Sequence, residues 1–132
     1  GKYVQVEDII NMAPEGFAVL SGNDEETLSL MSTGAAGVVS VVSNIVPRLT
    51  VRFVEAIQRG DFAQAKKLHF CLLPLFRNCF VESNPIPVKA AMALMGLMED
   101  TMRLPLMSAS ATTTELMRTT LSEVLCHEYE VE

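Results

Sequence analysis

The chain has 132 residues, of which 49% are hydrophobic, and a net charge of −6. This length suits one domain or part of a larger protein, with enough apolar residues to bury a core. Its ten lysines and arginines are scattered along the sequence, so nucleic acid and anionic membranes are not expected as partners, because both select a positive face. No apolar run approaches the roughly 20 residues that span a membrane.

The three cysteines, Cys71, Cys79 and Cys126, form neither a C-x-x-C pair nor a zinc-like spacing. We therefore expect buried, free thiols, with no metal site and no cofactor. His69 lies among apolar residues and is expected at the edge of the core. Free thiols, and a start without the apolar stretch of a signal peptide, predict a cytoplasmic protein.

Up to Gly60 the pattern alternates between helices and strands. The predicted segments are helix 8–12, strand 17–21, helix 24–34, strand 37–44 and helix 47–60. Asp24 is a candidate N-cap for the second helix, and Pro47 opens the third at a first-turn position. Val51, Val54 and Ile57 are expected on the inward face of that third helix.

The second predicted strand is a run of valines without regular polar alternation. Such strands are covered on both faces, as in parallel sheets. We therefore predict that 17–21 and 37–42 are adjacent parallel strands, because a βαβ connection joins neighbours right-handedly. The alternation is typical of a doubly wound sheet or a (β/α)8 barrel.

After Gly60 only helices are predicted. Asp61 caps a long helix that continues through Pro74. Its expected apolar face comprises Phe62, Ala65, Leu68, Leu72, Leu73, Phe76 and Phe80. A bend at 82–87 precedes a helix over 88–95 that Gly96 stops.

The last predicted helix begins with a capping box, Thr112-x-x-Glu115. The acidic tail over 127–132 is expected to be solvated or frayed.

Two strands that are apolar on both faces cannot form a stable sheet alone. A barrel of this type needs eight strands. We therefore expect the chain to be the C-terminal part of a longer protein, with its strand edges covered by another polypeptide. The predicted fold class is α/β: residues 1–60 form the last two βα units of a TIM barrel, and residues 61–132 form a C-terminal helical domain.

Six motifs occur in order along the chain: LSGND (20–24), GAAGVVSVVSN (34–44), GDFAQA (60–65), LPLF (73–76), FVESNPIPVK (80–89) and RLPL (103–106). In this combination the sequence resembles the dihydrodipicolinate synthase (4-hydroxy-tetrahydrodipicolinate synthase) family, from Gly1 to about Ser122. The resemblance implies a (β/α)8 barrel with a C-terminal helical extension, and roughly the last half of a family member.

The resemblance also implies a reaction. Family members condense pyruvate, held as a lysine Schiff base, with L-aspartate 4-semialdehyde in lysine and diaminopimelate biosynthesis, without a cofactor. The reactive lysine would fall just before Gly1. None of the four lysines, Lys2, Lys66, Lys67 and Lys89, ends a buried strand, so the isolated chain is predicted to be inactive.

The resemblance places five substrate-binding candidates in this segment: Gly22, Asn23, Asp24, Val39 and Asn84. Gly22 would let the backbone approach the aldehyde substrate, or is a simple turn glycine. Asn23 stands where the family usually has an acid. Asp24 is a substrate contact or an N-cap. Val39 would lie with its backbone against the pyruvyl group, although its side chain is typical of a core.

Asn84 lies in the bend that Pro85 and Pro87 stiffen. The resemblance places its amide beside the substrate pocket, and the alternative is a cap of the following helix. Glu82 and Lys89 are expected to pair or cap around the same bend.

The expected partners are the two substrates, the N-terminal half of the enzyme, and further copies in a tetramer or dimer. One alternative is a relative of N-acetylneuraminate lyase or 2-keto-3-deoxygluconate aldolase, against which NPIPVK argues. The other is a non-catalytic assembly module.

Overall fold

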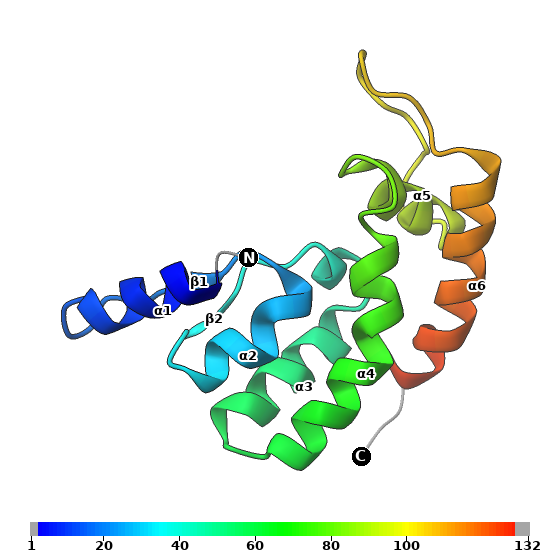
Figure 1. The fold of residues 1–132 in the computed structure, drawn as a ribbon. Helices are drawn as coiled ribbons and strands as arrows, with labels where there is room; N and C mark the ends of the chain where they lie inside the picture. The colour runs from blue at the N-terminus through cyan, green and yellow to red at the C-terminus, as the bar shows by residue number, and fades with distance from the viewer. Residues whose placement is uncertain (1–2, 129–132) are drawn as a thin grey trace.

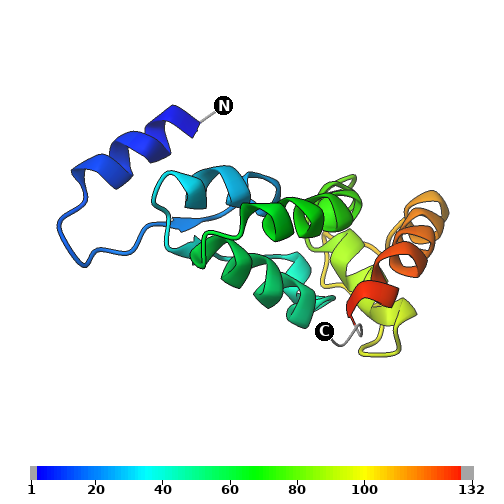
Figure 2. The same cartoon turned by 90° about the horizontal axis from the view of Figure 1, so that it is seen from below.

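The computed structural model describes residues 3–128. In the strand-containing half, helix α1 (Tyr3–Met12), strand β1 (Leu20–Ser21), 3-10 helix η1 (Asp24–Glu26) and helix α2 (Thr27–Ser32) come first, followed by strand β2 (Gly37–Val38), 3-10 helix η2 (Val42–Asn44) and helix α3 (Pro47–Gln58). The remainder consists of helices α4 (Phe62–Asn78), α5 (Ile86–Leu94) and α6 (Ala111–Glu128). Helices α1 and α6 lie at opposite ends of the molecule (Figures 1 and 2).

The two strands are adjacent and parallel, as the sequence predicts. Leu20 is in register with Gly37, and Ser21 with Val38. Both strands are shorter than predicted, and the second, predicted over 37–44, ends at Val38. The prediction was wrong for 39–44, where side chains bond the backbone: the Ser43 N–H donates to Ser40 Oγ, and η2 forms over Val42–Asn44 instead of a ladder.

The apolar residues around the strands are not covered as predicted. Leu20 is 50% exposed and Val39 is 68% exposed, and Phe17 is also exposed. The sheet has two strands within residues 3–128, so each strand lacks a neighbour on its outer side there. The two strands, which the sequence predicts to be buried on both faces, therefore keep exposed apolar side chains in this segment.

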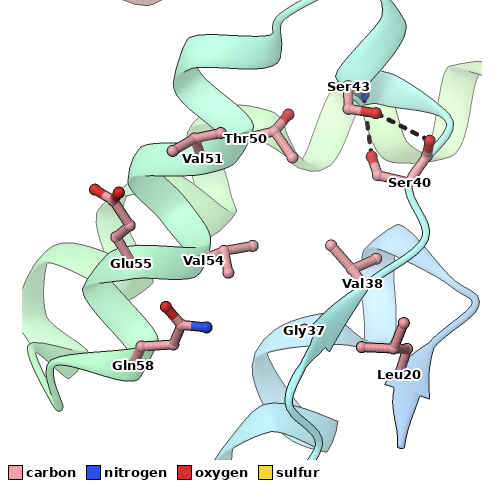
Figure 3. Close-up of a pocket in the computed structure, with 10 residues that line it drawn as sticks. All are labelled: Leu20, Gly37, Val38, Ser40, Ser43, Thr50, Val51, Val54, Glu55 and Gln58. Atoms are coloured by element: carbon pink, nitrogen blue, oxygen red, sulfur yellow. Dashed lines mark hydrogen bonds between the residues drawn. The ribbon is translucent and has the colours of Figure 1, made fainter. Parts of the chain in front are cut away.

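The core is centred on α3, α4 and α6. Its largest fully buried side chains include Phe53, Leu49, Leu72, Leu75 and Met117. The buried face of α3 differs from the predicted one: Ile57 is buried, Val54 is half-buried, and Val51 is exposed. Leu49, Phe53, Ala56 and Ile57 form the buried stripe, and Val54 points toward Val38 of β2 (Figure 3).

Helix α4 begins as predicted, because Asp61 Oδ1 accepts a hydrogen bond from the Gln64 N–H at 3.0 Å. The helix continues through Pro74 to Asn78. Phe62 and Phe80 do not belong to its buried face, since both are exposed. They lie at and beyond the ends of the helix, past the surface that α3 and α6 cover.

Helix α5 starts two residues earlier than predicted, so Pro87 lies in its first turn rather than in the bend. Gly96, with φ of 72°, follows the end of α5 as expected. Asn84 does not cap this helix: the N-cap is Pro85, and no side chain bonds the first turn. Lys89 Nζ donates to the Thr101 carbonyl, which ties α5 to the following loop.

Helix α6 is capped by Ser110 and not by the predicted Thr112–Glu115 box. The Thr113 N–H donates to Ser110 Oγ, whereas Glu115 pairs with Arg118 one turn further on. Glu82 accepts hydrogen bonds from the N–H and hydroxyl of Ser110. The pKa of the Glu82 carboxyl is held below its usual range, most strongly by the Thr113 hydroxyl and less strongly by the hydroxyl and N–H of Ser110. Glu82 thus ties the bend to the start of α6, and is not paired with Lys89.

The end of α6 is packed against α3, contrary to the expectation of a solvated tail. Glu128 is 5% exposed. Its two carboxylate oxygens accept hydrogen bonds from the N–H groups of Arg48 at 3.0 Å and Leu49 at 2.7 Å. The first turn of α3 has no side-chain cap of its own, so Glu128 takes that role. Residues 129–132 of the predicted tail lie outside the described part of the chain.

Of the three cysteines that were expected to be buried, Cys79 is buried, Cys71 is half-buried and Cys126 is exposed. Cys126 lies on an outward face of α6, which the apolar pattern alone did not separate from the core face. His69 is half-buried against Phe53 and Phe76, which confirms its place at the core edge.

Candidate functional site

The candidate site lies where the two loops leave the carboxyl ends of β1 and β2. The Val39 N–H donates to the Ser21 carbonyl at 2.8 Å, which extends the pairing one residue beyond β2. Parallel strands bring their carboxyl ends to the same edge, so the loops from 22 and from 39 start side by side.

A small polar network shapes the first loop. The buried Ser21 hydroxyl donates to the Asn23 carbonyl at 2.8 Å, and the Thr27 hydroxyl donates to the same carbonyl at 2.9 Å. Asn23 Oδ1 accepts from the Glu25 N–H at 3.2 Å and so caps η1. The sequence prediction that Asp24 is the N-cap was therefore wrong by one residue.

Asp24 instead reaches across to the second loop. Its side chain is 3% exposed, and Oδ2 accepts from the N–H groups of Val41 at 2.9 Å and Val42 at 3.3 Å. These donors lie at the start of η2. The carboxylate that follows β1 thus holds the backbone that follows β2.

Gly22 and Asn23 line a hollow of about 460 Å³ between this loop and the end of α4. Its other walls are Phe76, Phe80 and an ion pair: Arg77 Nη2 lies 2.7 Å from Glu25 Oε1, and Nε donates to the same oxygen at 2.8 Å. A Cβ added to Gly22 would meet nothing within 4 Å. The hollow therefore offers open backbone, both signs of charge and aromatic walls to a small polar molecule.

The remaining two predicted site residues lie elsewhere on the surface. Val39 is exposed beside the strand ends, and Asn84 is exposed in the turn between α4 and α5. Neither lines the hollow beside Gly22. Within the described residues, the structure thus joins Gly22, Asn23, Asp24 and the Val39 backbone through the two loops, while Asn84 stays in a separate turn.

A second hollow, of about 440 Å³, lies between β2 and α3 (Figure 3). Leu20, Val38, Val51 and Val54 form its apolar walls, and Ser40, Ser43, Glu55 and Gln58 form its polar rim. None of the predicted substrate-binding residues lines it. This hollow lies along the open side of β2, where the sequence expects a further element.

The lysines and the cysteine nearest the site do not form a reactive centre in the described chain. Lys66 and Lys67 are exposed on α4, and Lys89 is in the first turn of α5; Lys2 lies outside the described residues. Burial, and secondarily the charge of Asp24, raises the pKa of the Cys79 thiol to about 12. Cys79 is therefore a protonated structural thiol at neutral pH.

Between residues 3 and 128, no three His, Cys, Asp or Glu side chains are placed to hold a metal ion. In the same part of the chain, no helix is long and apolar enough to cross a membrane.

Parallel strands joined by helices, polar loops at the strand ends, and a following set of packed helices place the chain among α/β proteins built from βα units. The sequence model of the Dihydrodipicolinate synthetase family matches residues 1–124. The chain belongs to this family.

Relatives and solved structures agree with the family model. The 4-hydroxy-tetrahydrodipicolinate synthase of Methanospirillum hungatei is 46% identical over 123 residues, which is 92% of this chain and 42% of that protein. The synthase of Maridesulfovibrio salexigens is 53% identical over 102 residues, covering 77% of this chain and 35% of the relative. The chain thus spans less than half the length of these relatives.

Among solved structures, the dihydrodipicolinate synthase of Thermotoga maritima superposes with a TM-score of 0.90 at 42% identity, covering 92% of this chain and 42% of that one. The chloride-inhibited enzyme of Acinetobacter baumannii, complexed with pyruvate, superposes with a TM-score of 0.87 at 35% identity, covering 92% and 42%.

Sequence reasoning missed two features of the site. The Glu25–Arg77 pair joins residues 52 positions apart, and the Asp24 bonds to the second loop join residues 17 and 18 positions apart. No local pattern announces either one. The one signal in the sequence was that Asp24 follows Asn23, which can cap the helix by itself, so that the Asp24 carboxylate is left for another partner.

Proposed function

We propose that this chain is the C-terminal part of a 4-hydroxy-tetrahydrodipicolinate synthase, which joins pyruvate, as a lysine Schiff base, to L-aspartate 4-semialdehyde. Family membership supports the reaction, and the parallel β1–β2 pair with polar loops at its carboxyl ends is the observation that carries the proposal. Barrel enzymes build their active sites from loops at this end of the strands. Residues 1–60 would be the last two βα units, and residues 61–132 the helical domain.

The N-terminal half of the barrel is the proposed partner of the open strand edges. Leu20 and Val51, both about half exposed, line the apolar hollow beside β2. Exposed strand edges with apolar residues pair with other chains unless they are covered. A further strand of the barrel would fill the hollow in Figure 3 and bury those side chains.

The five candidate residues have distinct proposed parts. Gly22 and Asn23 would line the approach of the aldehyde substrate, in agreement with their place in the charged hollow. The Val39 backbone would lie against the pyruvyl group. Asn84 would reach the pocket from the helical domain once the barrel is complete. The Schiff-base lysine would come from the segment before Gly1, because a buried amine that is uncharged is what carbonyl attack needs.

The assembled enzyme is proposed to be a cytoplasmic homo-oligomer, a tetramer or a dimer, that needs no cofactor. The solved structure of the A. baumannii relative is complexed with pyruvate, which supports pyruvate as a ligand of the assembled enzyme. Relatives that are 39–53% identical to the chain carry the synthase name, which favours this reaction over that of the related lyases and aldolases.

The test is reductive trapping. The complete enzyme is this chain joined at Gly1 to its own N-terminal half or to that of the M. hungatei relative. Incubation with pyruvate and borohydride should add one reduced pyruvyl group to the complete enzyme and none to the 132-residue chain. Intact-mass spectrometry reads both results. A stoichiometric adduct on the isolated chain, mapped to Lys2, Lys66, Lys67 or Lys89, would overturn the assignment of the reactive lysine.

A further inference from the structure

Asp24 is a buried carboxylate whose hydrogen bonds serve a different segment of the chain. It is 3% exposed. One oxygen, Oδ2, accepts from the N–H groups of both Val41 and Val42, at 2.9 and 3.3 Å. A buried carboxylate is costly unless it is hydrogen-bonded, and bonds to a charged acceptor are stronger than neutral ones.

The capping of its own helix does not explain this carboxylate. Asn23 already performs that function, through the bond from the Glu25 N–H to Oδ1. The ion pair nearby likewise uses Glu25 and Arg77. The bonds from Asp24 to the second loop therefore have a function other than helix capping or ion pairing.

These bonds fix a short span of backbone from both ends. At one end, the Val39 N–H is bonded to the Ser21 carbonyl at 2.8 Å. At the other, the Val41 N–H is bonded to Asp24 at 2.9 Å. Both acceptors belong to β1 and the loop that follows it. The Val39 side chain is 68% exposed, so side-chain packing does not fix the backbone there. The two anchors hold it instead, together with the bond that the Ser43 hydroxyl donates to the Ser40 carbonyl at 3.0 Å.

We propose that Asp24 is a positioning residue for pyruvate: it holds the Val39–Ser40 backbone in the place where the bound pyruvyl group meets it. This inference rests on the proposed function for the role of that backbone. The predicted contact between Asp24 and substrate is the competing interpretation, and the two differ in which substrate responds to a substitution.

The experiment compares Asp24→Ala, Asp24→Asn and Asp61→Ala in the complete enzyme. Asp24→Ala should raise the KM for pyruvate about tenfold, as expected for the loss of charge-assisted anchors, and should change the KM for aspartate 4-semialdehyde far less. Asp24→Asn should recover much of the loss, because one amide oxygen can stand where Oδ2 accepts both N–H groups. Asp61→Ala removes a carboxylate cap at the start of α4 and should leave both KM values unchanged.

Amide hydrogen exchange tests the anchor without relying on catalysis. Exchange at Val41 and Val42 should be faster in Asp24→Ala than in the wild type by about tenfold. Faster exchange in Asp24→Ala, together with a wild-type complete enzyme that traps no pyruvate, would reject the proposed function and leave the anchor intact. Unchanged exchange would overturn the inference whatever the activity.

Three kinetic results would also overturn it. The first is a rise confined to the KM for the aldehyde, which would make Asp24 a substrate contact. The second is a lower Tm with unchanged kinetics, which would make it purely structural. The third is an Asp24→Asn enzyme no better than Asp24→Ala, which would show that the acceptor oxygen is not what matters.

Discussion

The helical region (61–128) and the strand region (3–58) differ in how fully they bury their apolar side chains and satisfy their backbone hydrogen bonds. In the helical region, carboxylates bond the backbone at helix starts: Asp61 at α4, Glu82 just before α6, and Glu128 at α3 of the neighbouring region. The strand region leaves Leu20 and Val39 exposed beside an apolar hollow. Helices satisfy their backbone within one segment, whereas a strand needs a neighbour on each side.

The difference shows which part of the chain depends on something outside it. Helices α4 and α5 both pack against α6, and α3 packs against α4 and α6, with leucines and alanines in the buried cluster. The parallel sheet contacts helix α2, but no third strand pairs with it within the described residues. The strand region therefore depends on a covering partner in a way that the helical region does not.

Thiol labelling should show the largest effect, at the junction of the two regions. Burial, then the charge of Asp24, raises the pKa of Cys79 to about 12. At pH 8 its thiolate fraction is then lower than that of an ordinary thiol by on the order of 10³. Iodoacetamide should therefore modify the exposed Cys126 long before Cys79 in the native chain, as followed by peptide mass spectrometry.

Urea removes the protection and supplies the control, because both thiols should then react at similar rates. Native labelling of Cys79 as fast as that of Cys126 would mean that the helical region does not stay closed over the loop after β1.

Leucine truncation measures the contrast directly. Leu72, fully buried in α4, should lose about 2–5 kcal/mol of unfolding free energy when replaced by alanine, because a cavity remains. Leu20→Ala in β1 is the matched variant and should cost less than about 1 kcal/mol, since Leu20 is half exposed. Urea unfolding of the 132-residue chain gives both values.

The same pair sharpens the proposal of a missing barrel half. In the complete enzyme, Leu20→Ala should become markedly more destabilising, because the neighbouring strand covers the side chain. Equal costs of the two substitutions in the isolated chain would break the comparison.

The cap that Glu128 provides should have a smaller effect. Glu128→Ala leaves the N–H groups of Arg48 and Leu49 without their acceptors, at a cost of about 1–3 kcal/mol. Glu123→Ala, at an exposed position of the same helix, is the control and should stay within about 0.5 kcal/mol. Thermal or urea unfolding decides. Equal losses of unfolding free energy in the two variants would show that the end of α6 behaves as the solvated tail that the sequence predicts.

The smallest expected effect is a pH dependence from His69. Burial, the largest cause, lowers the pKa of His69, and its Nδ1 is buried without a hydrogen-bond partner. A lowered pKa in the folded state means that the unfolded chain binds the proton more readily. The stability that neutral His69 contributes to the folded state is therefore complete above about pH 6.5, the ordinary histidine pKa. It is lost as the pH falls below that value.

The measurement is the slope of unfolding free energy between pH 7 and pH 5 for the wild type and for His69→Leu. The substitution should flatten the slope. An unchanged slope would assign the pH dependence to other groups.

Much of the element order could be predicted from the sequence, because its signals lie within a few residues of the element they define. Pro47 at the first turn of α3, Asp61 three residues before its donor at Gln64, and Gly96 after α5 are of this kind. The parallel pairing of β1 and β2 also followed from a local rule about crossovers. The five candidate site residues came from motif resemblance, and their contacts with substrate stay predictions.

Two of the failures share one physical cause: the partner that decides the structure is distant in sequence. Asp24 bonds Val41 rather than its own helix, and Glu128 bonds Leu49, 79 residues away. The valine run after Gly37 carries the composition of a strand, yet those distant and local acceptors bend it into η2. The amino-acid sequence by itself determined where α3 and α4 start and that the strands run parallel, because the proline, the cap and the crossover rule that decide them are local. Only the tertiary structure decided which carboxylate serves which backbone, because that depends on segments brought together by burial of the core.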